Sequence, residues 1–147
     1  MAERDPLHLA LRALRFRDRT AAELDARLDE RGVTADERDE ALETLARAGY
    51  VDDRRVARAR AATLAERGAG DALIRADLSG RGVAPELVEE AIGTLAPERA
   101  RAEQVLARRG PGSKTVRYLA SRGFDEDTLE AVAARGPVSL HGTPGAR

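Results

Sequence analysis

Apolar residues recur every three or four positions along most of this chain, and polar residues fill the positions between them. Leu7, Leu11 and Leu14 are one example, because this spacing places three side chains on one face of an α-helix. Breaks that contain glycine or proline separate the periodic stretches and interrupt helices. The pattern predicts nine helices, at residues 7–16, 20–31, 35–48, 53–67, 71–81, 85–95, 97–109, 113–122 and 126–135.

One pattern occurs three times, at residues 24–33, 74–83 and 115–124, and in each copy a helical stretch ends in Arg-Gly followed by an apolar residue. Glycine readily adopts the left-handed backbone that follows a helix, and arginine in the last turn interacts favourably with the negative helix end. The apolar residue can then pack back onto the completed helix. The pattern predicts structural helix stops at Arg31, Gly32, Arg81, Gly82, Arg122 and Gly123.

Signals for helix starts follow these stops at once, and a further signal, at Thr20, opens the helix that the first stop ends. Thr20 with Glu23, and Thr34 with Glu37, match the capping box, in which the two side chains satisfy backbone N–H groups at a helix start. Pro85 suits a first helical position, where its missing N–H is not needed. Starts and stops therefore predict the same short helices as the apolar periodicity.

The helices group into three tandem units of three. A unit of about 45 residues buries little apolar surface alone, so neighbouring units are expected to stack. The predicted fold class is all-α, with three three-helix repeats in an elongated, curved array. The expected repeats span residues 1–50, 51–95 and 96–135, and the Gly- and Pro-rich residues 136–147 are expected to form a disordered tail.

Composition narrows the possible chemistry. The chain of 147 residues is 42% hydrophobic and 35% charged, and it has no cysteine, which excludes disulfides and thiol nucleophiles. His8 and His141 lack neighbouring residues at metal-ligand spacing, and the stretch 110–114 lacks the spacing of a phosphate loop. We therefore expect no enzyme, no cofactor and no metal. Without an apolar signal stretch or a long apolar run, we expect a cytoplasmic protein with no membrane contact.

The order of these motifs resembles the RecX family of RecA regulators, and the likeness runs from about Leu9 to Ala134. Residues 10–24 (ALRALRFRDRTAAEL) look like the first repeat of the family. Residues 49–57 (GYVDDRRVA) are similar to its most recognisable internal motif, and Arg122-Gly123-Phe124 matches its third-repeat turn.

The resemblance implies a function that the composition alone does not indicate. It implies a monomeric regulator of DNA repair and the SOS response, which binds the RecA filament on single-stranded DNA. There it would inhibit recombination, ATPase and coprotease activity. Both capping of filament ends and binding along the filament groove are compatible with the sequence.

Charge is distributed unevenly along the chain, although the net charge is only −1. Residues 20–50 contain nine acidic residues and four arginines, whereas residues 97–122 contain seven basic residues and two acidic ones. In broad terms the first helix of each unit is basic and the third is acidic. Basic segments favour phosphate contact and acidic ones favour a basic protein surface. The candidate filament- or nucleic-acid-binding residues are Arg99, Arg101, Arg108, Arg109, Lys114, Arg117, Arg54, Arg55 and Arg58.

One other interpretation stays open for these residues, and two alternative functions stay open for the protein. Charged helix faces are commonly only solvated. Aromatic residues in such chains belong to the core more often than to base-stacking sites. We therefore expect the core to contain most of the four aromatic residues, Phe16, Tyr50, Tyr118 and Phe124. A helix-turn-helix DNA-binding regulator is one alternative function, although the third helices begin with acidic residues. A helical scaffold that binds only proteins is the other.

Overall fold

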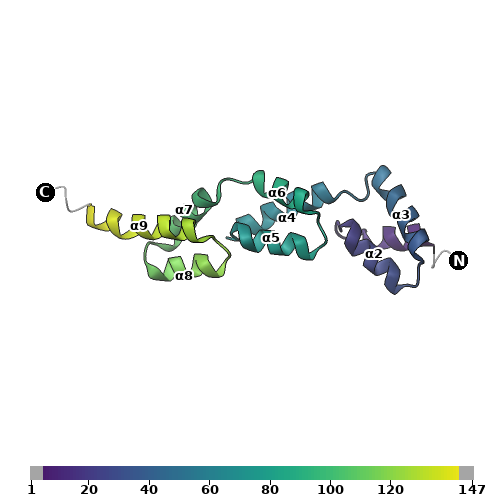
Figure 1. The fold of residues 1–147 in the computed structure, drawn as a ribbon, viewed down its shortest axis with the longest axis horizontal. Coiled ribbons are helices and arrows are strands. Elements are labelled where there is room, and N and C mark those ends of the chain that lie inside the picture. Colours follow the sequence, from purple (N-terminus) through teal and green to yellow (C-terminus); the bar gives the residue numbers. More distant parts are fainter. Residues whose placement is uncertain (1–4, 143–147) are drawn as a thin grey trace.

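The computed structural model describes residues 5–142, with side chains described for residues 5–134. This part of the chain is all-helical, with nine α-helices and no strand. The helices form groups that follow one another in sequence order along the long axis of the molecule (Figure 1). The helices are α1 (Pro6–Ala13), α2 (Ala21–Glu30), α3 (Ala35–Arg47), α4 (Asp53–Glu66), α5 (Asp71–Gly80), α6 (Pro85–Gly93), α7 (Glu98–Arg109), α8 (Ser113–Ser121) and α9 (Glu126–Gly142).

Two helix ends differ clearly from the predicted ones. Helix α1 ends at Ala13 rather than near residue 16, and the Arg19 Nε donates a hydrogen bond of 2.8 Å to the Ala13 carbonyl, which a further helical turn would otherwise use. Helix α9 continues to Gly142, beyond the predicted end at residue 135. A proline such as Pro137 removes one backbone donor, but it need not end a helix whose other hydrogen bonds remain. The rest of the expected tail, residues 143–147, lies outside the described residues.

Local hydrogen bonds explain where the helices begin and end. Both predicted capping boxes are present, at Thr20 and Thr34. The glycines of the three Arg-Gly stops have φ between 81° and 88°, and in each copy the N–H of the next residue donates to a carbonyl five residues back. This is the Schellman arrangement, which satisfies carbonyls that a helix end leaves without partners.

Three apolar clusters form the core in sequence order. Leu28, Leu78 and Leu119 occupy the same position in the three copies of the repeat, each is at most 1% exposed, and each belongs to a different cluster. Truncating such a buried leucine to alanine costs about 2–5 kcal/mol. In the third copy Thr115 is buried where the others have an aliphatic residue, and its Oγ1 donates to the Gly110 carbonyl at 2.6 Å. The short core of each three-helix group thus follows from the repeated apolar spacing.

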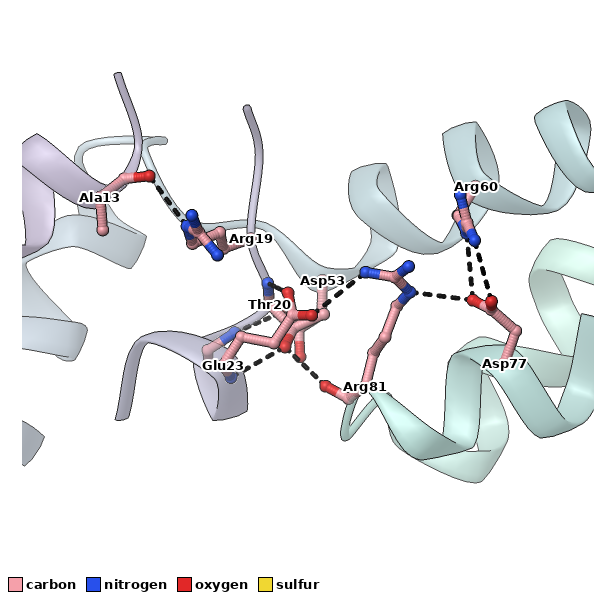
Figure 2. A network of polar contacts seen from close by, with 9 residues as sticks. Ala13, Arg19, Thr20, Glu23, Asp53, Arg60, Asp77 and Arg81 are labelled. Carbon is pink, nitrogen blue, oxygen red and sulfur yellow. Dashed lines mark hydrogen bonds and ion pairs between the residues drawn. The ribbon is translucent and has the colours of Figure 1, made fainter. Parts of the chain in front are cut away.

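Helices α1 to α3 form the first group, α4 to α6 the second and α7 to α9 the third. The first and second groups meet where α2 begins and α5 ends (Figure 2). Thr20 Oγ1 donates to the Arg81 carbonyl at 2.6 Å, and the Arg81 guanidinium contacts Glu23 at 3.2 Å. The backbone N–H of Ala21 donates to Asp53 at 2.8 Å. The N-terminal residues of one helix therefore bind the C-terminal residues of another, 61 positions away in the sequence.

The second and third groups repeat this contact between α5 and α8. Gly70 N–H donates to the Arg122 carbonyl at 2.7 Å, and Ala72 N–H donates to the Gly123 carbonyl at 3.1 Å. The backbone of one helix start thus again binds the carbonyls of an Arg-Gly helix end. A start with partial positive charge meets an end with partial negative charge in both junctions, which is electrostatically favourable.

Glycine is required at these two helix ends for a reason beyond its φ. An added Cβ at Gly82 would lie 2.3 Å from the Ala22 Cβ, and one at Gly123 would lie 2.6 Å from the Leu73 nitrogen. Either separation is far inside normal packing distance. The repeated Arg-Gly pair therefore ends a helix and also joins successive groups of helices.

A buried carboxylate completes the second junction. Glu98, only 8% exposed, accepts hydrogen bonds from the backbone N–H of Asp71 at 2.7 Å and of Asp125 at 3.2 Å. Its side chain also accepts a hydrogen bond from the Thr128 hydroxyl at 2.8 Å. A buried charge is tolerated when several donors surround it, so Glu98 connects three helix starts, those of α5, α7 and α9.

Candidate functional site

Ion pairing divides the candidate arginines into groups, and those of α4 are largely neutralised. Arg54 and Arg58 both contact Glu90, at 2.6 and 2.8 Å, and Arg55 contacts Asp18 at 2.9 Å. The hydrogen bond from Arg54 is the main reason why the pKa of Glu90 lies below its ordinary value. These exposed pairs contribute little to stability. A phosphate that bound these arginines would first have to displace their carboxylate partners.

The two candidates at the start of α7 differ sharply from each other. Arg99 is exposed and lies 3.7 Å from Glu103 on the same helix. Arg101 is only 7% exposed, and its guanidinium donates to the carbonyls of Ala96 and Ala69, both at 2.9 Å, and to the Asp71 carboxylate. Arg101 therefore joins the second and third groups of helices, and we remove it from the candidate interface.

The remaining candidates lie at the end of α7 and on α8. These candidates are the exposed residues Arg108, Arg109, Lys114 and Arg117. No ion pair joins any of them to a carboxylate among residues 5–134. Lys114 and Arg117 share one face of α8 with Tyr118, because residues three and four positions apart are neighbours on a helix. We call these four cations the α7–α8 basic surface.

A cleft of ≈ 320 Å³ borders this surface, between the end of α4 and helices α7 and α8. Arg67, Arg108 and Arg109 line it together with Tyr118, and Glu66 is the one acidic residue in its lining. The Arg109 guanidinium lies over the Tyr118 ring, 3.7 Å from the ring centre. Such stacking holds a guanidinium in place and leaves its N–H groups available for an anion. The cleft can therefore bind phosphate or carboxylate.

Sequence reasoning missed Arg67 as a neighbour of the basic surface. Arg67 precedes Gly68, and the sequence alone indicates only that this pair ends a helix. Arg122 Nη2 donates to the Arg67 carbonyl at 3.3 Å, which brings the end of α4 against the end of α8. The signal in the sequence was the Arg67-Gly68 pair itself, because the Arg-Gly pairs at 81–82 and 122–123 also lie at junctions between groups of helices.

The aromatic residues do not behave alike. Phe124 is a core residue at 5% exposure, and Tyr118 packs partly buried against the same cluster, as expected. The expectation is wrong for Phe16, which is 89% exposed in the connection after α1, and for Tyr50, which is 54% exposed. Helix α1 ends early, so Phe16 lies outside the helical face that packs inward; the Arg15 guanidinium lies 5.5 Å from its ring centre.

Two other kinds of feature are absent from the described part of the chain. Within it, no helix is long and apolar enough to cross a membrane. No group of three or more His, Cys, Asp or Glu side chains is placed to hold a metal ion, again among the described residues.

This arrangement defines a class: a helical-repeat protein that presents an extended, charged surface. Residues 52–92 match the family described as "RecX, second three-helix domain". The regulatory protein RecX of Chromohalobacter salexigens is 39% identical over 141 residues, covering 90% of this chain and 93% of that protein. The one from Thermus thermophilus is 40% identical over 126 residues, covering 82% and 84%. The chain belongs to the RecX family of regulatory proteins.

A solved structure supports the same fold. The crystal structure of RecX from Lactobacillus salivarius superposes with a TM-score of 0.78, covering 94% of this chain and 99% of that one. Its sequence is only 20% identical to this chain, so that likeness concerns the fold. The helical array is therefore shared in shape where most side chains differ.

Proposed function

We propose that this protein binds the RecA filament on single-stranded DNA and inhibits its recombinase, ATPase and coprotease activities. It would act as a monomer in the cytoplasm and thereby restrain DNA repair by recombination. The observation that carries this proposal is the α7–α8 basic surface, whose four cations have no carboxylate partner among the described residues.

Phosphate binding by this surface has a clear physical basis. Cations that replace the counterions around a nucleic acid release them, and the affinity then falls with salt by a slope of about −0.7 per phosphate on single strands. Arg109 is already held over Tyr118, so its guanidinium loses less freedom on binding. Arg99 adds an exposed cation on the same helix, whereas Arg54, Arg55 and Arg58 bind phosphate only after losing Glu90 or Asp18.

Acidic helices support a protein partner in addition to DNA. Helix α3 lies at the opposite end of the molecule from α8 (Figure 1), and it carries a series of acidic residues at its surface: Asp36, Glu37, Asp39, Glu40 and Glu43. DNA would repel them, whereas a basic protein surface would attract them. A filament of protein on DNA offers both surfaces to one elongated molecule.

The test reverses the charge of the basic surface. The variant Arg108→Glu/Arg109→Glu/Lys114→Glu is expected to bind RecA filaments at least about tenfold more weakly and to lose inhibition of ATPase and strand exchange. The salt slope of binding should become shallower by about 0.7 for each phosphate that the variant no longer binds. Fluorescence anisotropy with labelled filaments at several salt concentrations measures both quantities.

The matched control is Arg17→Glu/Arg47→Glu/Arg75→Glu, which also reverses three exposed cations but in the first and second groups of helices. It should retain most of its binding and inhibition. Equal losses in both variants would mean that only overall charge matters, and unchanged binding of the first variant would reject the basic surface. If the unmodified protein binds duplex DNA in a sequence-dependent way, or binds only a partner without DNA, the helix-turn-helix or scaffold function replaces this proposal.

A further inference from the structure

The Arg-Gly helix ends of the three repeat copies, at the ends of α2, α5 and α8, are not equivalent. The ends of α5 and α8 each bind the start of another helix through a backbone carbonyl, that of Arg81 or Arg122. The end of α2, at Arg31 and Gly32, has no such neighbour among the described residues: an added Cβ at Gly32 would meet nothing within 4 Å. Arg31 is also exposed. The chain thus presents a third copy of its own junction surface, unfilled, at one end of the molecule.

A cavity of ≈ 240 Å³ lies beside this helix end, between α1 and α2. Its apolar floor is formed by Leu9, Ala10, Leu24 and Leu28. Its polar lining consists of Arg12, Arg27, Arg31 and Glu30. Three guanidinium groups therefore share the cavity with one carboxylate, and no ion pair joins those arginines to any described acid.

The repeat explains why this cavity has surplus positive charge. Asp77 of the second copy aligns with Arg27 of the first. In the second copy, Asp77 accepts hydrogen bonds from Arg60 at 3.0 and 3.1 Å and from Arg81 at 2.9 Å. In the first copy, the exchange of this carboxylate for Arg27 removes the acceptor and adds a third cation. Arg31 therefore lacks counterparts of both carboxylates that Arg81 contacts, Asp77 and Glu23.

We propose that this end of the molecule binds the start of a helix from a different protein, one whose first turn carries a carboxylate. The two internal junctions supply the geometry. A cap hydroxyl or N–H would donate to the Arg31 carbonyl, as Thr20 and Gly70 do at their junctions. The carboxylate would accept from Arg31, as Glu23 accepts from Arg81 in Figure 2. The aligned helix ends would add a favourable dipole interaction.

Charge and hydrogen bonding argue against the other two occupants. In a second copy of this chain, the helix start that would have to fill this position is that of α8, which carries Lys114 in its first turn and no acid. Lys114 would face Arg31, so head-to-tail assembly is disfavoured. A nucleic-acid phosphate could contact the arginines, but it has no N–H or O–H group to donate to the Arg31 carbonyl, whereas a helix start offers both a donor and a carboxylate. A protein helix start with an acidic residue suits the Arg31 carbonyl, the Arg31 guanidinium and the negative helix end alike.

The test uses a peptide that already fits such a surface. A synthetic peptide of residues 18–33 contains Thr20 and Glu23, and a lactam from Ala26→Lys to Glu30 holds it helical, because short peptides alone are marginal helices in water. Titrated into ¹⁵N-labelled protein, it should shift the amide signals of Arg27, Arg31, Gly32 and Val33. No RecA and no DNA are present, so the result is independent of the proposed function.

A charge swap separates this contact from non-specific attraction. Arg31→Glu should weaken binding of the peptide about tenfold, and a Glu23→Arg peptide should recover binding to that variant. Arg17→Glu, another exposed arginine of the first unit, is the matched control and should bind the original peptide normally. Thermal unfolding checks that the variants fold, and Arg31→Ala replaces Arg31→Glu if the latter does not.

Three results would overturn the proposal. The first is no shift at these amides with millimolar peptide. The second is equal binding of the original and Glu23→Arg peptides to the unmodified protein. The third comes from a parallel titration with a single-stranded oligonucleotide: stronger shifts at the same amides than the peptide causes would identify a nucleic-acid surface instead.

Discussion

Arg101 and Arg109 carry the same side chain on the same helix, yet their surroundings give them different roles. Arg101 is buried and uses its planar group of donors to join Ala96, Ala69 and Asp71. Arg109 lies exposed over Tyr118 and has no carboxylate partner among the described residues. Burial and the available acceptors therefore decide whether a guanidinium serves the fold or a ligand.

Arg101 gives a prediction at the residue scale. Arg101→Lys keeps the charge but replaces a rigid fork by one ammonium group, which cannot reach acceptors in three directions. We expect the free energy of unfolding to fall by about 2–3 kcal/mol, because buried acceptors lose their donors. Urea unfolding followed by circular dichroism measures this, with Arg47→Lys on the exposed face of α3 as the control. A loss of equal size in the control, or none in Arg101→Lys, would contradict the structural role.

At the scale of the elements, helix ends join one group of helices to the next. The end of α5 contains Asp77, whose pKa lies below the ordinary value. The hydrogen bond from Arg60 is the main cause, and the one from Arg81 adds to it, whereas partial burial acts in the opposite direction. Arg81 in turn contacts Glu23 of the first unit. A single carboxylate thus fixes the arginine that joins two groups of helices.

This carboxylate predicts a pH dependence. Because its pKa is lower in the folded state than the ordinary value of about 3.9, Asp77 stabilises the fold at higher pH. That contribution is lost as the pH falls below about 4 and through the folded-state pKa. Asp77→Asn should therefore be less stable than the original protein at neutral pH, and the difference should shrink on acidification. Urea unfolding at a series of pH values from neutral down to about 3 tests this, and a constant difference would contradict it.

The elements also show what could be predicted from sequence. Caps, stops and apolar spacing act within a few residues, so the capping box at Thr20 and the stop at Gly32 could be predicted. Contacts across groups of helices could not: Arg81 and Glu23 are 58 positions apart, and burial of Arg101 depends on acceptors from two groups. For the candidate site, the basic segment was visible in the charge pattern. Dividing the candidate cations into paired, buried and unpaired ones required the positions of the acidic residues in the folded structure.

At the scale of the whole molecule, an elongated array has no single core that holds all its parts. Each of the three apolar clusters is small, so the junctions between them decide whether the molecule unfolds as one unit. The two junctions use the same kind of paired helix ends, with a backbone hydrogen bond of 2.7 Å at Gly70 and a side-chain cap at Thr20. If the proposed filament binding holds, these junctions would fix the spacing between the α7–α8 basic surface and acidic α3, so that both could bind one filament at once.

Gly70 tests this coupling directly. Its added Cβ would lie 2.5 Å from the backbone of Gly123 and Phe124, which cannot move aside without opening the second junction. Gly70→Ala should cost about 3 kcal/mol. Amide hydrogen exchange should then speed up throughout α7 to α9 more than in α2. The matched control is Gly80→Ala in the same helix, α5. An added Cβ at Gly80 would meet nothing within 4 Å, so this variant should stabilise the helix by about 0.5–1 kcal/mol. Equal acceleration of exchange in all helices would show that the array unfolds as one unit even with this junction opened.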